Sequence, residues 1–574
     1  MSWRKIYEQW STYENLDESL SQQLAALSDQ TDALEDAFYA PLEFGTAGMR
    51  GILGPGINRM NIYTIRQATE GLARFIDTQD EDTRKRGVAI AYDSRHLSPE
   101  FALEAACTLA QHGIPSYVFE SLRPTPELSF AVRHLNTFTG IMITASHNPA
   151  NYNGYKVYGE DGGQMPPADA AALTTFVREI ENPLDIAVLS EEAAKAQGLI
   201  HFIGEPVDQA YLAEIKSVTI NQPLIDEMGD ALKLIYTPLH GTGKMLGERA
   251  LMQAGFKKFI IEPTQGKADP DFSTVKSPNP EEHSAFEYAI ALGEKEGADL
   301  LIATDPDADR LGAAIRLPNG EYQVLSGNQI GAILIHYILE AHQAAKTLPK
   351  NAVVLKSIVS SELPTAIANS YGVEMMNVLT GFKFIAEKIQ QFETDHSHTF
   401  MFGFEESYGY LVKPFVRDKD AIQALVLFAE VAAYYKKQGK TLYDALQMIF
   451  DTYGYFSEKT ISVTMSGQEG SAQIAALMQT FREKAPTHFA DVKVIQTEDF
   501  KHLTKTFEDG TVEMLTTPPS DVLKYVLADD SWIAVRPSGT EPKMKFYIGV
   551  KADSQVAADE KIVALEAAIN EIVG

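Results

Sequence analysis

The sequence contains a single cysteine, Cys107, among 574 residues, so no disulfide can form within the chain. Cys107 lies in an apolar, helix-like stretch and is expected to be a small buried hydrophobic residue. The sequence also lacks any run of the roughly 18 apolar residues that a membrane span requires. Its first residues lack the apolar centre of a signal peptide. These absences predict a cytoplasmic protein in a reducing compartment.

Positive charge is also scarce. Lysine and arginine together number 49 against 78 aspartates and glutamates, which gives a net charge of −29. This excess of negative charge argues against nucleic acid or an anionic membrane as a partner. It does not exclude a basic cleft, because a total says nothing about local arrangement. We expect no nucleic acid and no membrane as partner, and a monomer or a weak homo-oligomer.

A repeated pattern indicates the fold. Residues 86–120, 231–263 and 351–379 each combine an apolar strand, a polar loop, an amphipathic helix, a glycine and a second strand. The glycines fall where the residue after a helix needs a positive φ, at Gly113, Gly255 and Gly372. Such units predict parallel strands joined by right-handed crossovers. Three related α/β domains are expected, and one large doubly wound domain is the alternative.

The order of strand-like and helix-like stretches changes after about residue 455. Strand-like stretches such as KTISVTM, VKVIQTEDF, WIAVRPS and KMKFYIGVKAD then alternate with two helix-like stretches, SAQIAALMQTFREK and SQVAADEKIVALEAAINEIV. This order predicts a smaller C-terminal α+β domain. The first 40 residues look helical and carry no chemical motif.

Three aspartates in the stretch DPDADR are candidate metal ligands. Asp305, Asp307 and Asp309 alternate directly after the strand-like ADLLIAT. An extended turn would aim all three carboxylates at one point, and such hard oxygen ligands suit Mg²⁺ or Ca²⁺. The stretch is not an EF-hand loop, because Arg310 and Arg316 stand where that loop needs glycine and glutamate. A solvated acidic turn is the alternative.

Two further loops carry groups that suit a sugar phosphate. In RPSGTEPK, an arginine, two hydroxyls, a glycine and backbone N–H groups favour phosphate binding, although an ordinary Pro-Ser-Gly turn is the alternative. In GFEESYGY, Glu405 and Ser407 lie two residues apart, so on an extended chain both would point to the same side. A carboxylate beside a hydroxyl suits vicinal sugar hydroxyls, and an acid-rich helix start is the alternative.

Ser146 lies in TASHNPANYNGYK, just after the apolar run FTGIMI. It is not in a G-x-S-x-G elbow, because Ala145 and His147 flank it, and no His-Asp pair is identifiable as its triad. Considered alone, it is a turn serine before Asn-Pro. The stretch EFGTAGMRG offers Arg50 in a glycine-rich loop, and AYDSRHLS offers Arg95 just past a strand.

Taken together, TASHNP, DPDADR, GFEES and RPSGTEPK occur in this order at domain-length spacing. The set resembles the α-D-phosphohexomutase family over nearly the whole chain and looks most like its phosphoglucomutases. FGTAGMRG, YDSR, NYNGYK, TPLHGTG, TGFKF and RDKDA fit the same pattern, whereas Tyr408 and Ala421 depart from it. The resemblance implies four domains around a central cleft, for which we expect the bounds 1–210, 211–323, 324–453 and 454–574.

The resemblance also implies a role for each loop. The serine matching Ser146 is a phosphoserine in that family, and it binds Mg²⁺ together with the aspartates of the metal loop, Asp305, Asp307 and Asp309. The catalytic set is Ser146, His147, Lys156 and Arg50. The expected substrate-binding residues are Glu405, Ser407, Thr380, Gly381, Lys383, Arg310, Arg536, Ser538, Gly539 and Thr540. Of these, the loop from Arg536 to Thr540 is expected to bind the phosphate that is not reacting.

The resemblance therefore implies an intramolecular phosphotransferase that acts on small-molecule sugar phosphates. Glucose 1-phosphate and glucose 6-phosphate would interconvert through a phosphoserine enzyme and a glucose 1,6-bisphosphate intermediate, which also serves as activator. Lys156 or His147 would receive the proton of the attacking hydroxyl. Phosphomannomutase and phosphopentomutase are the nearest alternatives. A Mg²⁺-dependent sugar phosphatase and a non-catalytic sugar-phosphate sensor are the alternatives from other classes.

Overall fold

A computed structural model describes residues 2–42, 48–465, 470–538 and 543–573 of the chain. The chain forms two compact units. The first consists of Met1–Gly327, Ala386–Phe402 and Ser407–Thr441, and the second consists of Asn328–Ile385, Gly403–Glu406 and Leu442–Gly574. Each unit has hydrophobic cores of its own. Among the residues described, no helix is both long enough and apolar enough to cross a membrane.

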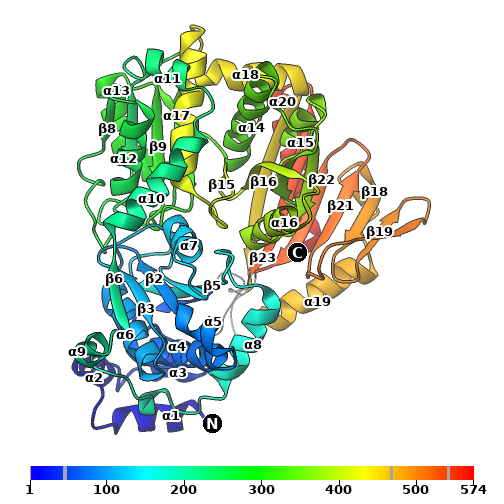
Figure 1. The fold of residues 1–574 in the computed structure, drawn as a ribbon. Helices are drawn as coiled ribbons and strands as arrows, with labels where there is room; N and C mark the ends of the chain where they lie inside the picture. The colour runs from blue at the N-terminus through cyan, green and yellow to red at the C-terminus, as the bar shows by residue number, and fades with distance from the viewer. Residues whose placement is uncertain (1, 43–47, 466–469, 539–542, 574) are drawn as a thin grey trace. The chain divides into compact units, whose positions relative to one another are not determined.

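The first unit contains a sheet with the strand order β1-β5-β4-β2-β3-β6 (Figure 1). Its parallel part is β4-β2-β3-β6, and β5 pairs antiparallel with both β4 and β1. β2 and β4 are buried along their whole length, as expected of apolar strands in a parallel sheet. The strands are β1 (Met49–Ile52), β2 (Val88–Tyr92), β3 (Ser116–Phe119), β4 (Thr139–Ile143), β5 (Tyr152–Tyr158) and β6 (Ile200–Ile203).

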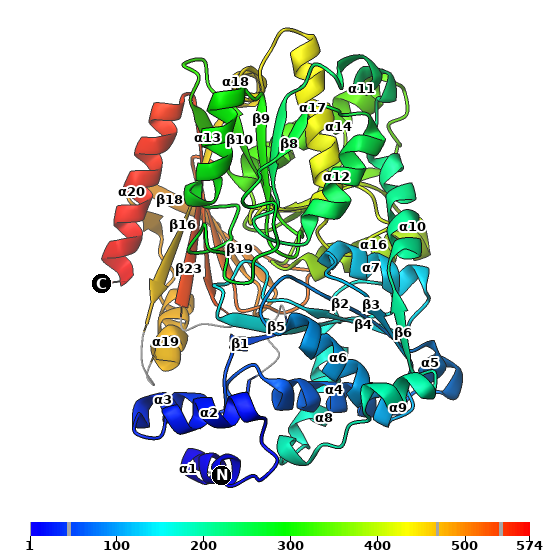
Figure 2. The same ribbon diagram turned by 90° about the vertical axis from the view of Figure 1, so that its left-hand side faces the viewer.

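Helices surround this sheet, and the N-terminal three form a cluster of their own (Figure 2). The Trp10 ring lies edge-on to Phe38 at 5.7 Å and to Tyr63 at 5.4 Å, so aromatic contacts hold these helices on α4. The helices are α1 (Trp3–Ser11), α2 (Glu18–Ala26), α3 (Thr31–Phe38), α4 (Ile62–Asp77), α5 (Glu81–Arg86), α6 (Ser98–Gln111), α7 (Thr125–His134), α8 (Pro167–Arg178), the 3₁₀ turn Pro183–Asp185 and α9 (Glu191–Ala196).

A second sheet of the first unit has the order β11-β10-β9-β7-β8. β8, β7 and β9 are parallel, and β10 turns back antiparallel to β9. The strands are β7 (Leu234–Thr237), β8 (Phe259–Ile261), β9 (Leu300–Thr304), β10 (Leu311–Arg316) and β11 (Tyr322–Val324). The helices are α10 (Glu205–Ile215), α11 (Gln222–Met228), α12 (Gly243–Ala254), α13 (Glu287–Glu296) and the 3₁₀ turns Lys216–Val218 and His283–Phe286.

Helix α17 (Ala421–Lys437) follows the third repeat in sequence but packs in the first unit, against α12, β9 and β10 (Figure 1). It is buried over nearly its whole length. The Glu430 carboxylate in its middle accepts the backbone N–H groups of Ile220 and Asn221, at 3.0 and 2.8 Å, just before α11 begins. The short strand β15 (Gly409–Leu411) lies in the same unit.

The second unit combines a βαβ segment with a C-terminal antiparallel sheet of order β16-β23-β22-β21-β18-β19-β20, in which β17 pairs with β18. The elements of the βαβ segment are α14 (Gly327–Ala344), β12 (Ala352–Ser357), α15 (Leu363–Ser370) and β13 (Glu374–Val378). α16 (Phe382–Asp395) and β14 (Thr399–Glu405) each run from one unit into the other. The C-terminal elements are α18 (Leu442–Tyr453), β16 (Tyr455–Thr464), α19 (Gly470–Glu483), β17 (His488–Phe489), β18 (Val492–Asp499), β19 (Thr504–Phe507), β20 (Val512–Met514), β21 (Leu523–Leu527), β22 (Trp532–Pro537), β23 (Lys543–Ala552) and α20 (Gln555–Val573).

The predicted strand–helix–strand repeats are confirmed. Their strands β2/β3, β7/β8 and β12/β13 pair in parallel. The three glycines after their helices have φ values of 67°, 116° and 69°, as the pattern requires: Gly113, Gly255 and Gly372. The helical N-terminus and the C-terminal α+β region are confirmed as well. In the C-terminal region, sequence reasoning did not identify β17, β19 and β20, which are short or exposed, or β21, which is apolar and mostly buried.

Replacing Glu430 by alanine removes the acceptor of two backbone N–H groups in the first unit. We expect the free energy of unfolding to fall by about 2 kcal/mol, because such groups lose hydrogen bonds that water does not fully replace. Thermal unfolding followed by circular dichroism measures the effect. Glu294→Ala, at an exposed position of α13, is the matched control. Equal melting temperatures for the two variants would contradict the expectation.

Candidate active site

Ser146 lies just beyond β4 in a conformation that non-glycine residues rarely adopt. Its φ is 52°, and its backbone N–H donates to Thr144 Oγ1 at 2.8 Å, which fixes the turn. Its hydroxyl is buried and donates to Asp305 Oδ2 at 2.7 Å. His147 Nδ1 is 3.1 Å from the same hydroxyl. The local strain costs of order 1 kcal/mol and is typical of functional turns.

The buried side chain of Arg95 holds the turn that presents Ser146. Its guanidinium donates to four backbone carbonyls, those of Ser146 (2.7 Å), Asn148 (2.5 Å), Pro149 (2.8 Å) and Tyr152 (3.0 Å). Asp93 pairs with Arg95 at 3.2 Å and keeps the guanidinium in place. Sequence reasoning noted Arg95 only as a basic residue past a strand, whereas the structure shows it supporting the loop.

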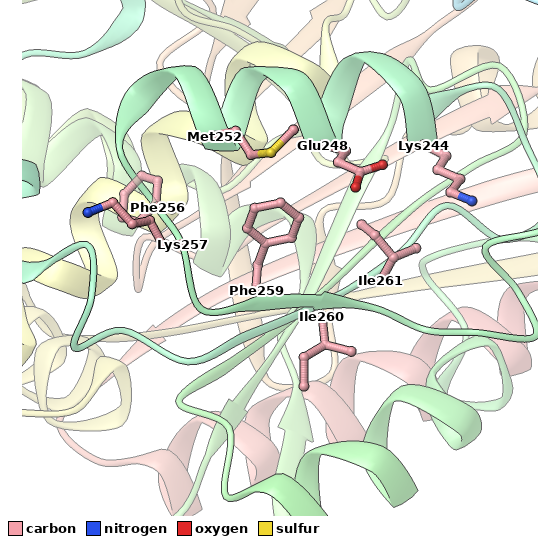
Figure 3. A pocket seen from close by; sticks show the side chains of 8 residues that line it. All are labelled: Lys244, Glu248, Met252, Phe256, Lys257, Phe259, Ile260 and Ile261. Atoms are coloured by element: carbon pink, nitrogen blue, oxygen red, sulfur yellow. The ribbon is translucent and has the colours of Figure 1, made fainter.

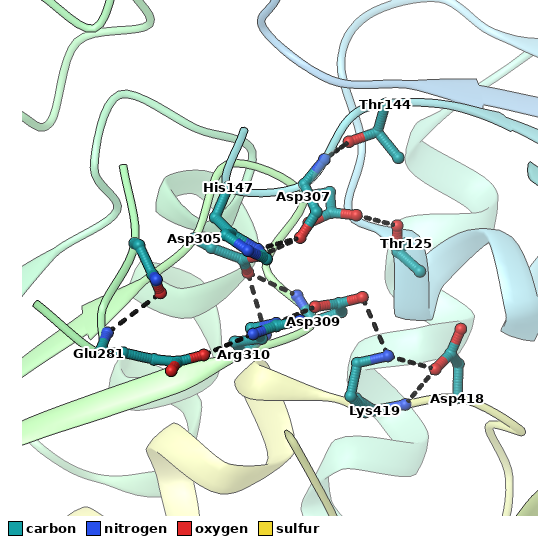
Figure 4. Close-up of polar contacts among 12 residues, drawn as sticks. Thr125, Thr144, His147, Glu281, Asp305, Asp307, Asp309, Arg310, Asp418 and Lys419 are labelled. Carbon is teal, nitrogen blue, oxygen red and sulfur yellow. Dashed lines mark hydrogen bonds and ion pairs between the residues drawn. The ribbon is translucent and has the colours of Figure 1, made fainter. Parts of the chain in front are cut away.

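The three predicted metal ligands converge, as the alternating pattern suggested. Asp305, Asp307 and Asp309 are buried, and each offers a carboxylate oxygen within 4.8 Å of the others (Figure 4). Asp305 Oδ1 accepts the backbone N–H groups of Asp309 and Arg310, at 3.1 and 3.0 Å, so the loop wraps around its own first carboxylate. The solvated acidic turn is therefore wrong, because these carboxylates are buried.

Two lysines from other parts of the first unit touch this carboxylate cluster. Lys156 Nζ on β5 lies 3.0 Å from Asp307 Oδ2 and 3.6 Å from Asp309 Oδ2. Lys419 Nζ lies 3.2 Å from Asp309 Oδ2 and 3.0 Å from Asp418 Oδ1 (Figure 4). Because both lysines use the Oδ2 atoms, they leave the Oδ1 atoms of the second and third aspartates to other ligands.

The remaining oxygens fit a divalent cation. Asp307 Oδ1 and Asp309 Oδ1 are buried and have no hydrogen-bond partner, and a buried carboxylate oxygen without a partner is costly. The donors are hard oxygens, the type that Mg²⁺ prefers. Asp305, Asp307 and Asp309 are thus the residues that could hold the ion, beside the hydroxyl of Ser146.

The pKa values of the aspartates reflect how close their carboxyl groups lie to one another. Burial, followed by the charges of Asp307 and Asp309, raises the pKa of Asp305 well above its usual range. Burial also acts to raise the pKa of Asp307, but the charge of Lys156 and hydrogen bonds with Asp305, Lys156 and Thr125 together outweigh it, and the net pKa is lowered. One carboxyl is therefore pushed toward its neutral form while its neighbour stays charged, which is the sign of a site short of positive charge.

His147 and two arginines complete the basic side of this site. Burial, then the charges of Arg310 and Arg50, lowers the pKa of His147 well below its usual range. Arg50 Nη1 donates to Asn148 Oδ1 at 3.1 Å, and Arg310 Nη1 pairs with Glu281 at 2.6 Å. The structure thus places the predicted catalytic residues and Arg310 beside the loop that carries the metal ligands.

The loop that contains Gly241 and Thr242 packs against the aspartate loop. The backbone of Gly241 packs so closely on Pro306 that a Cβ there would lie 2.3 Å from the proline Cα. The next residue, Thr242, donates its backbone N–H to the carbonyl of Pro306 at 2.8 Å. Only glycine permits this contact, which explains the glycine in the stretch TPLHGTG.

Other predicted residues lie in the second unit. Glu405 ends β14, and its Oε1 accepts the backbone N–H of Gly381 at 2.7 Å. Thr380, the residue before Gly381, has a buried Oγ1 without a hydrogen-bond partner. The Lys383 ammonium lies 5.4 Å from the ring centroid of Phe384. The structure therefore brings together the GFEES and TGFKF loops, which sequence reasoning had treated separately.

The geometric reason given for pairing Glu405 with Ser407 is wrong. Residues 406–408 form a turn rather than a continuation of the strand, and Tyr408 has a φ of 65°. Two-residue alternation holds only along an extended chain. Side-chain alternation therefore cannot be used to place Ser407 beside Glu405.

Arg536 lies near the end of β22, and its side chain hydrogen-bonds to Tyr547 on β23. Burial, then the charge of Glu406, raises the pKa of Tyr547, with Glu405 acting in the same direction. Ser538 donates its backbone N–H to the carbonyl of Lys543 at 2.7 Å. The predicted residues Gly539 and Thr540 lie outside the described residues.

Sequence reasoning missed Thr125 and Lys419. Thr125 opens α7 and donates twice to Asp307, from Oγ1 to Oδ2 and from its N–H to the carbonyl, both at 2.9 Å. The only signal was the helix start RPTPEL. Lys419 was visible in the stretch RDKDA, but nothing in the sequence linked it to an aspartate more than a hundred residues earlier.

A separate hollow of about 680 Å³ lies on α12 and β8 (Figure 3). Lys244, Glu248 and Met252 line it from the helix, and Phe259 and Ile261 from the strand. None of these residues is a predicted site residue, and none is close to the aspartate loop in the chain. The size of a hollow is therefore no guide to the chemistry of this protein.

Comparisons with known proteins agree over most of the chain. Residues 41–184, 209–318 and 326–453 match the α/β/α domains I, II and III described as phosphoglucomutase/phosphomannomutase, and residues 473–565 match the C-terminal domain. A phosphoglucomutase from Staphylococcus haemolyticus is 41% identical over 536 residues, which cover 93% of this chain and 95% of that protein. One from Staphylococcus aureus is 42% identical over 536 residues, covering 92% and 93%.

The solved structures agree on the fold. A phosphoglucomutase/phosphomannomutase family protein from Burkholderia thailandensis superposes with a TM-score of 0.66 at 17% identity, covering 92% of this chain and 97% of that chain. At this identity the likeness concerns the fold alone.

The orphaned oxygens of the aspartate loop predict a cation-dependent gain in stability. Saturating Mg²⁺ should stabilise the protein by roughly 2–3 kcal/mol at about a hundred times its dissociation constant. In Asp309→Asn the cation-free protein should be as stable as wild type or more so, because a buried charge is removed, and the gain with Mg²⁺ should disappear. Thermal unfolding with Mg²⁺ or with EDTA measures both effects.

Asp269→Asn is the control, because Asp269 accepts from Ser273 and Asp271 in another loop. It should keep the response to Mg²⁺. An undiminished Mg²⁺ response in Asp309→Asn would show that the cation binds elsewhere.

Proposed function

The chain belongs to the phosphoglucomutase/phosphomannomutase family, and from this premise we propose that it is a phosphoglucomutase. The reaction interconverts glucose 1-phosphate and glucose 6-phosphate through a phosphoserine enzyme and a glucose 1,6-bisphosphate intermediate. The observation that carries the proposal is the hydroxyl of Ser146, 2.7 Å from Asp305 in a cluster of three buried aspartates. The relatives' names support glucose as the sugar.

Mg²⁺ is the proposed cofactor, held by Asp305, Asp307 and Asp309 together with the phosphate on Ser146. When bound, the ion neutralises the phosphate and polarises it toward attack. Phosphoryl transfer depends on positioning and charge neutralisation more than on covalent chemistry by the protein. The strained turn at Ser146, fixed by Arg95, supplies the positioning.

The chain's own residues carry the proton and the phosphoryl group. The C6 hydroxyl of glucose 1-phosphate attacks the phosphorus of phospho-Ser146, a new P–O6 bond forms, and the P–Oγ bond breaks. The hydroxyl proton passes to His147 or Lys156 and from that residue to the serine oxygen as it leaves, so the residue ends the step in its starting protonation state. His147 Nδ1 lies 3.1 Å from that oxygen, whereas Lys156 is ion-paired to Asp307, so the geometry favours His147 at this atom.

In the second half-reaction the bisphosphate returns its 1-phosphate to Ser146, and glucose 6-phosphate leaves. The bisphosphate therefore acts as activator whenever the serine has lost its phosphate. The residues proposed to bind the sugar and its phosphates are Glu405, Ser407, Thr380, Gly381, Lys383, Arg536, Ser538, Gly539, Thr540, Arg310 and Arg50. We retain the four expected segments as the proposed domains, and propose a cytoplasmic enzyme with small-molecule sugar phosphates as its ligands.

The proposal is tested by turnover of the 1-phosphates of glucose, mannose and ribose, with and without glucose 1,6-bisphosphate and EDTA. We expect the highest kcat/KM for glucose, stimulation by the bisphosphate and loss with EDTA. A clear preference for mannose or ribose would reassign the substrate within the family. Release of free phosphate in place of isomerisation would identify a phosphatase.

Intact-mass spectrometry tests the phosphoserine directly. Incubation with the bisphosphate should add about 80 Da, the mass of HPO₃, to the wild-type protein. Ser146→Ala should lose both the added mass and the mutase activity while keeping the wild-type melting temperature. An added mass that persists in Ser146→Ala would move the phosphoryl carrier to another residue.

A further inference from the structure

The segment of residues 357–362, which begins at the last residue of β12 in the second unit, contacts two parts of the chain that the proposed function uses separately. On one side it holds Glu406. The hydroxyls of Ser357 and Ser360 donate to Glu406 Oε2, at 2.7 and 3.2 Å, and the N–H of Glu406 donates to Ser360 Oγ at 3.1 Å. Both serines are fully buried, and their hydroxyls are 2.9 Å apart.

Glu406 lies between two proposed sugar-binding residues, Glu405 and Ser407, in the chain. Three hydrogen bonds fix both its carboxylate and its backbone N–H, so it anchors the turn at residues 406–408. Glu405 is held in turn by the N–H of Gly381. Two buried hydroxyls, which take part in no step of the mechanism, therefore position the sugar-binding loop.

On its other side the same segment is tied to the C-terminal sheet. Lys524 Nζ on β21 donates to the carbonyl of Ile358 at 2.9 Å and lies 3.5 Å from Glu362 Oε1. Lys356 Nζ lies 3.0 Å from the same oxygen. Burial acts to raise the pKa of Glu362, but the two lysines outweigh it and hold the pKa at about 2, so this carboxylate stays charged.

Lys524 is next to the strand that carries Arg536. It pairs with Ala534 on β22, two residues before Arg536, and its ammonium lies 4.6 Å from the ring centroid of Trp532. Side chains of the segment and of the sheet share one hydrophobic cluster: Ile358, Val359, Leu379, Phe500, Val522, Trp532, Ala534 and Tyr547. Residues 357–362 thus connect the GFEES loop to the proposed phosphate-binding strand within one packed body.

Resting on the proposed function, we propose that Ser357, Ser360 and Glu406 are positioning residues for the sugar. We further propose that Glu362 and Lys524 couple the sugar-binding loop to the strand of Arg536. The sugar and its distal phosphate are then bound by parts of one assembly, and loosening either end weakens binding of the whole substrate.

The first test removes one hydroxyl. Ser360→Ala leaves Glu406 without the acceptor of its N–H, and the KM for the sugar 1-phosphate should rise about tenfold, the effect of one lost buried hydrogen bond. The kcat should stay within about threefold, because a displaced sugar-binding loop weakens binding of the ground state and of the transition state alike. Ser360→Thr keeps the hydroxyl and should restore the wild-type KM.

Ser370→Ala is the control, because the Ser370 hydroxyl hydrogen-bonds to the carbonyl of Ile367 at 2.7 Å and to the hydroxyl of Tyr453 at 3.0 Å, and to neither Glu406 nor residues 357–362. It should leave KM unchanged. A Ser360→Ala protein with a lower melting temperature but the wild-type KM would overturn the positioning role. If that variant does not fold, Ser357→Ala, which keeps the two hydrogen bonds between Ser360 and Glu406, is measured instead and should raise KM in the same direction.

The second test addresses the coupling. Lys524→Met keeps the apolar stem over Trp532 and removes the ammonium, so KM should rise by about fivefold. If both changes act through the same segment, Lys524→Met combined with Ser360→Ala should raise KM by less than the product of the single effects. Fully multiplicative effects would overturn the coupling.

Failure of the proposed function is recognised separately. All KM values are measured with whichever 1-phosphate of glucose, mannose or ribose the wild type turns over best, and the dissociation constant of glucose 6-phosphate is measured by calorimetry in parallel. Wild type that binds glucose 6-phosphate without turnover overturns the function, and the variants then test the positioning through that dissociation constant.

Discussion

Three buried carboxylates within 4.8 Å of one another are the constraint on which the rest of the first unit depends. Like charges at this distance repel, and burial removes the water that would screen them. The surrounding structure answers both problems. Lys156 and Lys419 supply positive charge, Thr125 and the backbone of the aspartate loop supply hydrogen bonds, and two oxygens stay open for a cation.

The rigidity of the serine loop follows from the same constraint. A phosphate on Ser146 would add about two negative charges to this site. The serine turn must therefore be held near the aspartates at a fixed distance. Its turn is held by the four carbonyls that Arg95 binds, and the aspartate loop is held by the backbone of Gly241 and Thr242. The net charge of −29 is compatible with this site, because basic side chains such as Lys156 and Lys419 lie beside the buried carboxylates.

The sequence was sufficient for the local structure and for the inventory of chemistry. Continuous apolar strands, amphipathic helices and glycines at helix ends predicted the three strand–helix–strand units, because these patterns are set by neighbours in the chain. It was not sufficient for contacts made by folding. No local signal says that Ser146 and Asp305 touch, or that α17 packs against β9 after following the third repeat. The alternation argument for pairing Glu405 with Ser407 failed for a local reason, since residues 406–408 form a turn and not an extended strand.

The residues that sequence reasoning missed share one physical property. Thr125, Lys419, Ser360 and Lys524 hold a charged or catalytic group through contacts with distant segments of the chain, and their types are common at turns and strand ends. A cluster of aspartates is visible in one dimension because its members are adjacent, whereas its counter-charges come from distant segments. Charge balance therefore gives a rule for such sites. Once a buried acidic motif is found, the basic residues that must accompany it have to be sought along the whole chain, as Lys156 on β5 and Lys419 in the stretch RDKDA show.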